Sequence, residues 1–187
     1  DGDGTVYRGN GGDGKVYNED GSYDELPEGV QTVVAFGECA NMVVSFAGEH
    51  ALMGADATFL DNDFIKKAYK AKDIANAKKI SIDSDKQIDA DKVAKLGPDA
   101  VLVMNNSYKI SAAGLDKLKN ANVDVVYLPA MNSAKHIKHI AKAIGKMFGD
   151  ASSTLSGDDA SAAAKEYTDW HDRSEEHTSE LQSRSDL

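Results

Sequence analysis

Two short runs of apolar, largely β-branched residues constrain the fold of this chain most. Ala100–Met104 reads AVLVM and Val123–Leu128 reads VDVVYL, and between them Leu115 and Leu118 fall on one face of a predicted helix. Strands that are apolar on both faces must be covered on both faces, and strands separated by helices run parallel. The sequence therefore predicts an α/β fold, a parallel sheet flanked by helices in a Rossmann-like lobe.

The same alternation of apolar runs and helical periodicity begins at Val30 and continues through most of the chain. Further strands are predicted at Thr32–Phe36, Leu52–Ala57 and Ile80–Ile82. Helices are predicted near Met42–Phe46, Phe64–Tyr69 and Ile88–Leu96, over Ile137–Phe148 and over Asp158–Trp170. The last of these is rich in Ala with few large apolar residues, so it needs a neighbouring element to pack against.

Composition divides the chain into four segments. Residues 1–29 are rich in Gly and Asp and are interpreted as a linker or the remnant of a hairpin, residues 30–132 as the α/β lobe, and residues 133–172 as the region of the long helix. Residues 173–187 continue no pattern, and the string RSEEHTSELQS within them resembles a translated sequencing-library adapter. We therefore expect this last segment to be artefactual.

Charge and cysteine content exclude several classes of protein. The net charge is -10, and no Arg lies between residues 30 and 172, so the basic, Arg-containing surface typical of nucleic-acid binding is missing. The single cysteine, Cys39, excludes an internal disulfide. No apolar run approaches the roughly 20 residues that cross a bilayer. Nucleic acid is therefore not an expected partner.

Three motifs resemble binding sites but are better explained otherwise. Gly9–Gly14 matches the dinucleotide pattern G-x-G-x-x-G, yet no apolar strand precedes it and no amphipathic helix follows. Asp83, Asp85, Asp89 and Asp91 resemble a metal cluster, but Asp89 stands where a helix N-cap is expected. His136 and His139 have metal-ligand spacing, but a solvated helix flank is favoured. We predict no metal site and no cofactor.

Catalytic residues are also hard to find. Cys39 at a helix N-terminus has the position of an activated thiol, but no His stands at a spacing that a nucleophile motif predicts. A small buried thiol at the end of a strand is the favoured interpretation of Cys39, with ligand contact as the alternative. The sequence predicts a protein that is not an enzyme.

Binding residues are predicted at the loops that follow the strands. In an open parallel sheet, ligands bind beyond the carboxyl ends of the strands, next to helix N-termini. The polar and aromatic residues there suit holding a large polar ligand. The candidates are Glu38, Cys39, Asn41, Thr58, Phe59, Asn105, Asn106, Tyr108, Met131 and Asn132.

The stretch from Val30 to about Trp170 resembles the amino-terminal lobe of the periplasmic-binding-protein family that captures iron–siderophore complexes, haem and cobalamin for ABC importers. TVVAFGECANMVVSFAGEHALMGAD is similar to the opening strand, helix and second strand of that family. IDADKVAKLGPDAVLVM and LDKLKNANVDVVYLPA are similar to its next two segments, and SAKHIKHIAKAIGKMFGD to its bridging helix. The most specific matches are KLGPD at residues 95–99 and IGK at residues 144–146.

This resemblance implies a bilobed substrate-binding protein, exported to the periplasm or lipid-anchored at the outer face of the membrane. It would capture an iron–siderophore complex, haem or a corrinoid and deliver it to an ABC permease, and its second lobe would follow the bridging helix. The lack of Arg weighs against a ferric-catecholate pocket. The chain departs from the family pattern where Asn41 replaces Glu and Gly97 replaces Lys, and the permease-docking acid is missing from Tyr108–Ser111.

Two other functions remain open on the residues alone. A single-lobe interaction domain accords with the missing docking acid. An α/β enzyme related to metal-cofactor assembly proteins predicts Cys or His ligands at the strand ends, where only Cys39 is found.

Overall fold

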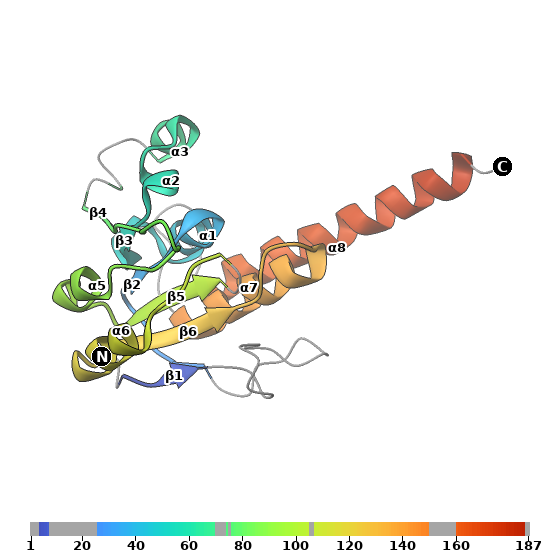
Figure 1. The fold of residues 1–187 in the computed structure, drawn as a ribbon. Coiled ribbons are helices and arrows are strands. Elements are labelled where there is room, and N and C mark those ends of the chain that lie inside the picture. Colours follow the sequence, from blue (N-terminus) through green and yellow to red (C-terminus); the bar gives the residue numbers. More distant parts are fainter. Residues whose placement is uncertain are drawn as a thin grey trace.

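The computed structural model describes residues 4–7, 26–69, 74, 76–104, 107–149 and 160–185, with side chains up to residue 175. The predicted parallel α/β fold is confirmed. Within these residues one sheet of six strands has the order β1-β6-β5-β2-β3-β4, and every neighbouring pair is parallel (Figure 1). The strands are β1 Val6–Tyr7, β2 Val33–Val34, β3 Leu52–Ala55, β4 Lys78–Lys79, β5 Ala100–Met104 and β6 Asp124–Leu128.

Helices flank this sheet in two groups, α1 with α7 and α8, and α5 with α6 (Figure 1). α8 runs beside α7 and then extends away from the sheet toward the C-terminus (Figure 1). No helix in the described part of the chain is long and apolar enough to cross a membrane. The helices are α1 Gly37–Ala47, α2 Ala57–Leu60, α3 Asp63–Ala68, α5 Ala90–Leu96, α6 Ala112–Asn120, α7 Ala134–Phe148 and α8 Ala160–Ser185, with a short 3-10 helix at Glu49–Ala51.

Several element boundaries lie where the sequence predicts them. β5 covers the whole AVLVM run and is buried along its length. The Asp89 side chain caps α5 by accepting a hydrogen bond from the Lys92 N–H at 3.0 Å. Gly97 ends α5 in the left-handed conformation, at φ 63°, which a residue with a Cβ adopts only at a cost. Local capping chemistry therefore sets both ends of this helix.

The edges of the sheet differ from the predictions. β4 consists of Lys78–Lys79 and not Ile80–Ile82, and Ile82 instead forms an isolated antiparallel bridge with Ile88. Ile80 N–H still donates to the Ala55 carbonyl at 2.8 Å, and the Ile80 side chain is buried. An edge strand pairs through its backbone on one side only, so exposed Lys side chains are compatible with it.

Two residues of the segment interpreted as a linker join the sheet. Val6–Tyr7 forms β1 and pairs in parallel with β6. The pairing is reinforced by Thr5, whose N–H donates to Asp124 Oδ1 at 2.9 Å and whose carbonyl accepts from Val125 N–H at 2.9 Å. Residues 8–25, including the Gly9–Gly14 motif, lie outside the described residues.

Asp99 connects the start of β5 to the chain before β2. Its Oδ2 accepts hydrogen bonds from the Gln31 and Thr32 N–H groups, both at 2.9 Å, and from the Thr32 hydroxyl at 3.2 Å. Partial burial raises the pKa of this carboxyl and the hydrogen bonds lower it, so that the pKa lies below its usual value. The carboxylate form of Asp99 is therefore part of the folded structure.

The helix α8 satisfies the expectation that an Ala-rich helix needs a packing partner. It begins at Ala160, close to the predicted start at Asp158, but continues beyond Trp170 to Ser185. Its small residues let it approach α7 closely: a Cβ added at Gly145 would lie 2.6 Å from the Cβ of Ala164. Close backbone approach compensates for the small number of large apolar side chains in α8.

Candidate functional site

A buried carboxylate lies at the carboxyl edge of the sheet. Asp56 directly follows β3 and is 3% exposed. Its Oδ1 accepts the N–H of Gly37 at 2.9 Å, and its Oδ2 accepts the hydroxyl of Tyr108 at 3.0 Å. Gly37 begins α1 after β2, and Tyr108 follows β5. One side chain therefore connects the segments that follow three adjacent strands of the sheet.

Tyr108, a predicted binding residue, is half-buried at this edge. Its ring centroid lies 5.1 Å from that of Phe36, with the rings tilted by 44°. Burial of the phenol, together with the charge of Asp56 and its hydrogen bond, raises the pKa of Tyr108 to about 12. Tyr108 is therefore a neutral phenol at physiological pH.

Glu38 and Asn41 lie on the first turns of α1. Glu38 is exposed, and Asn41 is half-buried and donates weakly to Glu38 Oε2 at 3.5 Å. The Asn41 Oδ1 accepts a hydrogen bond from the hydroxyl of Tyr69, which also contacts Ser45 Oγ at 3.0 Å. The amide of Asn41 therefore holds the end of α3 against α1. Sequence reasoning missed Tyr69, whose role depends on this long-range contact.

Two predicted site residues are buried in the core. Cys39 is 0% exposed and Phe59 is 3% exposed. Burial raises the pKa of the Cys39 thiol to about 12, which disfavours the reactive thiolate. The interpretation of Cys39 as a small buried thiol is confirmed. Thr58, next to Phe59, is exposed.

The segment after β6 contributes Met131, which is half-buried, and Asn132, which is exposed. The Nδ1 of His136 lies 3.0 Å from the Ala130 carbonyl oxygen and 2.6 Å from Asn132 Oδ1. A carbonyl oxygen only accepts hydrogen bonds, so Nδ1 carries a proton and donates it. His136 thus orients the Asn132 side chain and the Ala130 carbonyl. Asn105 and Asn106 lie outside the described residues.

The prediction of a solvated flank is wrong for His139. This side chain is 6% exposed because α7 presents it toward the body of the protein. Burial lowers the pKa of His139. The neighbouring positive charges on α7 lower it further, in decreasing order Lys135, His136, Lys142 and Lys138. The rings of His136 and His139 lie 6.4 Å apart. Across the described ranges, no group of three or more His, Cys, Asp or Glu residues is placed to hold a metal ion.

Asp89 is the helix N-cap that the sequence predicts, and Asp83 and Asp91 also have partners in the protein. Asp83 Oδ1 accepts from the N–H groups of Asp85 and Gln87 at 2.9 and 2.8 Å. Asp89 caps α5, and Asp91 in its first turn forms an ion pair with Lys117 at 2.7 Å. These contacts give Asp83, Asp89 and Asp91 partners within the described part of the chain.

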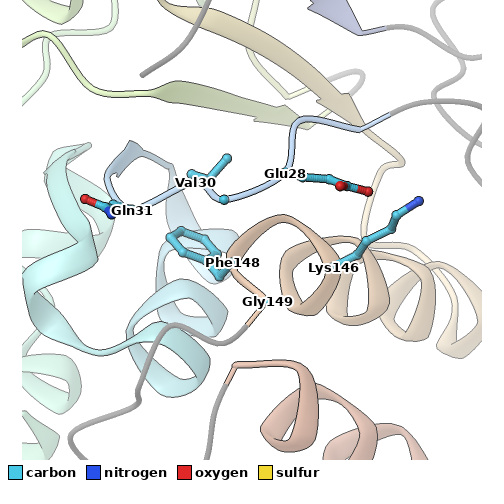
Figure 2. Close-up of a pocket in the computed structure, with 7 residues that line it drawn as sticks. Glu28, Val30, Gln31, Lys146, Phe148 and Gly149 are labelled. Carbon is cyan, nitrogen blue, oxygen red and sulfur yellow. The ribbon is translucent and has the colours of Figure 1, made fainter.

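A cavity of about 500 Å³ lies beside the chain that leads into β2, at the opposite end of the strands from Tyr108. It is formed by the segment that precedes β2 and by the C-terminal end of α7. Figure 2 shows the charged side chains of Glu28 and Lys146 at one side of it and the ring of Phe148 at the other. Sequence reasoning gave no sign of this cavity, which contains none of the predicted binding residues. Its lining is Glu28, Gly29, Val30, Gln31, Lys146, Phe148 and Gly149.

The carboxyl edge therefore offers an aromatic ring, hydroxyls, amides, a thioether and one exposed carboxylate. The one thiol of the chain is buried and protonated. Such an edge provides weak, directional contacts over a broad surface, which suits reversible binding of a ligand.

No family model matches the sequence, and no curated protein matches it. Solved structures do match the fold. The chain is similar to a periplasmic haem-binding protein from Pseudomonas aeruginosa, at 22% identity and TM-score 0.53, over 83% of this chain and 49% of that one. It is similar to a periplasmic solute-binding protein from Veillonella parvula, at 17% identity and TM-score 0.62, over 88% and 46%.

A possible iron-binding, periplasmic solute-binding protein from Staphylococcus epidermidis matches at 17% identity and TM-score 0.54, over 76% of this chain and 47% of that one. The chain spans less than half the length of each of these three proteins. At such identities the likeness shows a shared fold, and the fold expected from the sequence resemblance is confirmed.

Proposed function

We propose that this chain is the amino-terminal lobe of an exported substrate-binding protein that captures an iron–siderophore complex, haem or a corrinoid for an ABC importer. The observation that carries the proposal is the fold. The chain forms a parallel sheet. Its fold matches slightly less than half of the length of a periplasmic haem-binding protein and of a periplasmic solute-binding protein. In such an arrangement the ligand lies against the carboxyl edge of the sheet, between this lobe and a second one.

Binding without chemistry is the role that the carboxyl edge supports. Cys39 is buried and its pKa is raised to about 12, so the thiol is not poised as a nucleophile or a metal ligand. This argues against the metal-cofactor enzyme. No contact among the described residues specifically supports the alternative, a single-lobe interaction domain.

The ligand class follows from the groups exposed at the edge. Glu38, Thr58 and Asn132 are exposed, and Tyr108 and Met131 are half-buried. Aromatic and thioether groups fit the broad apolar faces of a metal complex, and hydroxyl and amide groups fit its polar rim. The absence of Arg between residues 30 and 172 disfavours a strongly anionic catecholate complex. Haem, a corrinoid or a ferric hydroxamate remains.

Delivery to a membrane permease and an exported location belong to the same proposal. An exported receptor of this kind works in the periplasm or lipid-anchored at the outer face of the membrane. Because no acidic residue lies in Tyr108–Ser111, docking on the permease would use another part of the lobe.

The test compares this chain with the protein obtained by reading the source DNA past the Asp172 codon. Each is titrated calorimetrically with haemin, a ferric hydroxamate and cyanocobalamin. We expect the longer protein to bind one of them saturably, and this chain to bind none at micromolar concentration, because one lobe supplies about half of the contacts. Tight binding by this chain, or no binding by the longer protein, contradicts the proposal.

A pair of variants in the longer protein locates the site. Thr58→Ala removes an exposed hydroxyl at the carboxyl edge, and the loss of one hydrogen bond weakens binding by about three- to tenfold. Lys146→Ala changes the cavity at the other end of the strands and leaves affinity unchanged. If the two substitutions changed the ligand affinity equally, the ligand would not bind at the carboxyl edge.

A further inference from the structure

The hydrogen bonds around Asp56 have only one possible direction. A carboxylate accepts hydrogen bonds and does not donate them, so Gly37 N–H and Tyr108 O–H are both donors to Asp56. The proton of Tyr108 therefore points inward, toward Oδ2 at 3.0 Å. Gly37 and Tyr108 therefore donate to the two oxygens of one carboxylate.

The side chain of Asp56 is not used for the local role that its position suggests. It stands at the N-cap position of α2 but makes no capping hydrogen bond there. It reaches instead to α1 and to the segment after β5. Burial of a carboxylate is costly unless it is hydrogen-bonded, and the Gly37 and Tyr108 donors offset that cost.

We propose that Asp56 is the positioning residue of the ligand-binding edge, which holds Tyr108 as an inward-donating neutral phenol, so that Tyr108 offers a ligand its ring face and an oxygen acceptor but not a phenolate. This inference rests on the proposed function in one respect, that the carboxyl edge faces the ligand. Its experimental test needs no ligand.

The chemical class of ligand is narrowed as a result. A ferric ion with open coordination positions would be held through anionic oxygen ligands, and a neutral phenol is a poor one. The phenol instead accepts hydrogen bonds from N–H or O–H groups and stacks against flat or apolar surfaces. The edge therefore suits a corrinoid or a ferric hydroxamate, whose metal is already enclosed and whose rim carries amide or hydroxyl donors, better than haem, whose axial positions are open and whose rim lacks such donors.

The ionisation of Tyr108 tests the proposal directly. Tyrosines are labelled with ¹³C at Cζ in the 187-residue chain, and Tyr108→Phe assigns the Tyr108 resonance. We expect Tyr108 to remain protonated at about pH 11, where ordinary tyrosines have ionised, since its pKa is about 12. A wild-type midpoint near the ordinary value of 10.0 would overturn the proposal, whatever the variants do.

Two aspartate variants then separate positioning from general destabilisation. Asp56→Asn keeps the shape of the side chain but removes its charge, and the midpoint of Tyr108 falls toward 10. Asp124→Asn removes another buried aspartate, 4% exposed at the amino end of β6, and leaves the midpoint unchanged. An unchanged midpoint in folded Asp56→Asn, or equal shifts in both variants, would refute the role of Asp56.

A metal probe tests the consequence for ligand class. Ferric nitrilotriacetate added to the wild-type chain at neutral pH is expected to give no ferric–phenolate charge-transfer absorption. A band that appears with the wild type and is lost in Tyr108→Phe would show a phenolate ligand and contradict the inference. Either result leaves the haemin, hydroxamate and cobalamin titrations independent, so failure of this inference and failure of the proposed function are told apart.

Discussion

Because α7 and α8 are in close contact, we predict that the substitution Gly145→Ala destabilises the protein, the opposite of its usual effect in a helix. In an exposed helix this change stabilises by about 1 kcal/mol, because Ala is the better helix former. Here the new Cβ would lie 2.6 Å from the Cβ of Ala164 and 3.3 Å from the carbonyl oxygen of Ala160, against about 3.5–4.0 Å for an ordinary carbon contact. The helices must separate by about 1 Å. Overpacking of this kind costs about 1–3 kcal/mol.

The net expectation is that Gly145→Ala lowers the free energy of unfolding by up to about 2 kcal/mol, measured by urea denaturation followed by circular dichroism. Ala164→Gly removes the opposing Cβ, so in the double variant the two changes are less than additive, with a coupling energy of about 1 kcal/mol or more. If Gly145→Ala stabilises the chain by about 1 kcal/mol and the changes simply add, α8 does not pack on α7 as described.

Three further predictions concern the carboxylate of Asp99, the thiol of Cys39 and residues 173–187. Asp99→Asn destabilises the chain by about 2 kcal/mol at pH 7. Since the folded pKa of Asp99 is lowered, this contribution is present above the ordinary value of 3.8 and disappears as pH falls through the folded value, so the variant and wild type converge in acid unfolding curves. Cys39 does not react with a thiol reagent until the chain unfolds, and rapid reaction in native buffer would contradict its burial. Deletion of residues 173–187 lowers the thermal midpoint by less than about 3 °C, because the exposed pair of Lys138 with Glu175 contributes at most about 1 kcal/mol and Asp172 remains.

The parts of the fold that could be predicted from the sequence are those set by local chemistry. The β5 run, the Asp89 cap and the Gly97 stop each depend on a few neighbouring residues. β1 could not be predicted, because Val6–Tyr7 is a strand only through pairing with β6, more than a hundred residues away. β4 was misplaced because edge pairing uses the backbone and leaves Lys78–Lys79 without an apolar signal.

The candidate site was predictable to a similar degree. Topology predicts that Thr58 and Tyr108 follow strands at the carboxyl edge of the sheet, and the structure places them there. Their role in binding stays a prediction. The role of Asp56 was hidden because its donors, Gly37 and Tyr108, lie 19 and 52 residues away. The one signal was an acidic residue directly after a buried strand, where burial demands hydrogen-bond donors. The burial of His139 could not be predicted, because it depends on how α7 packs.

The central claim is our proposal that this chain is one lobe of a two-lobed binding protein. It is tested most directly by reading the source DNA past the Asp172 codon, because the sequence leads us to expect that residues 173–187 derive from an adapter. The account predicts an open reading frame that continues for a segment of comparable length, with apolar runs and helical periodicity alternating as they do from Val30 to Phe148. A stop codon directly after Asp172 would contradict it, and would favour a single-lobe interaction domain.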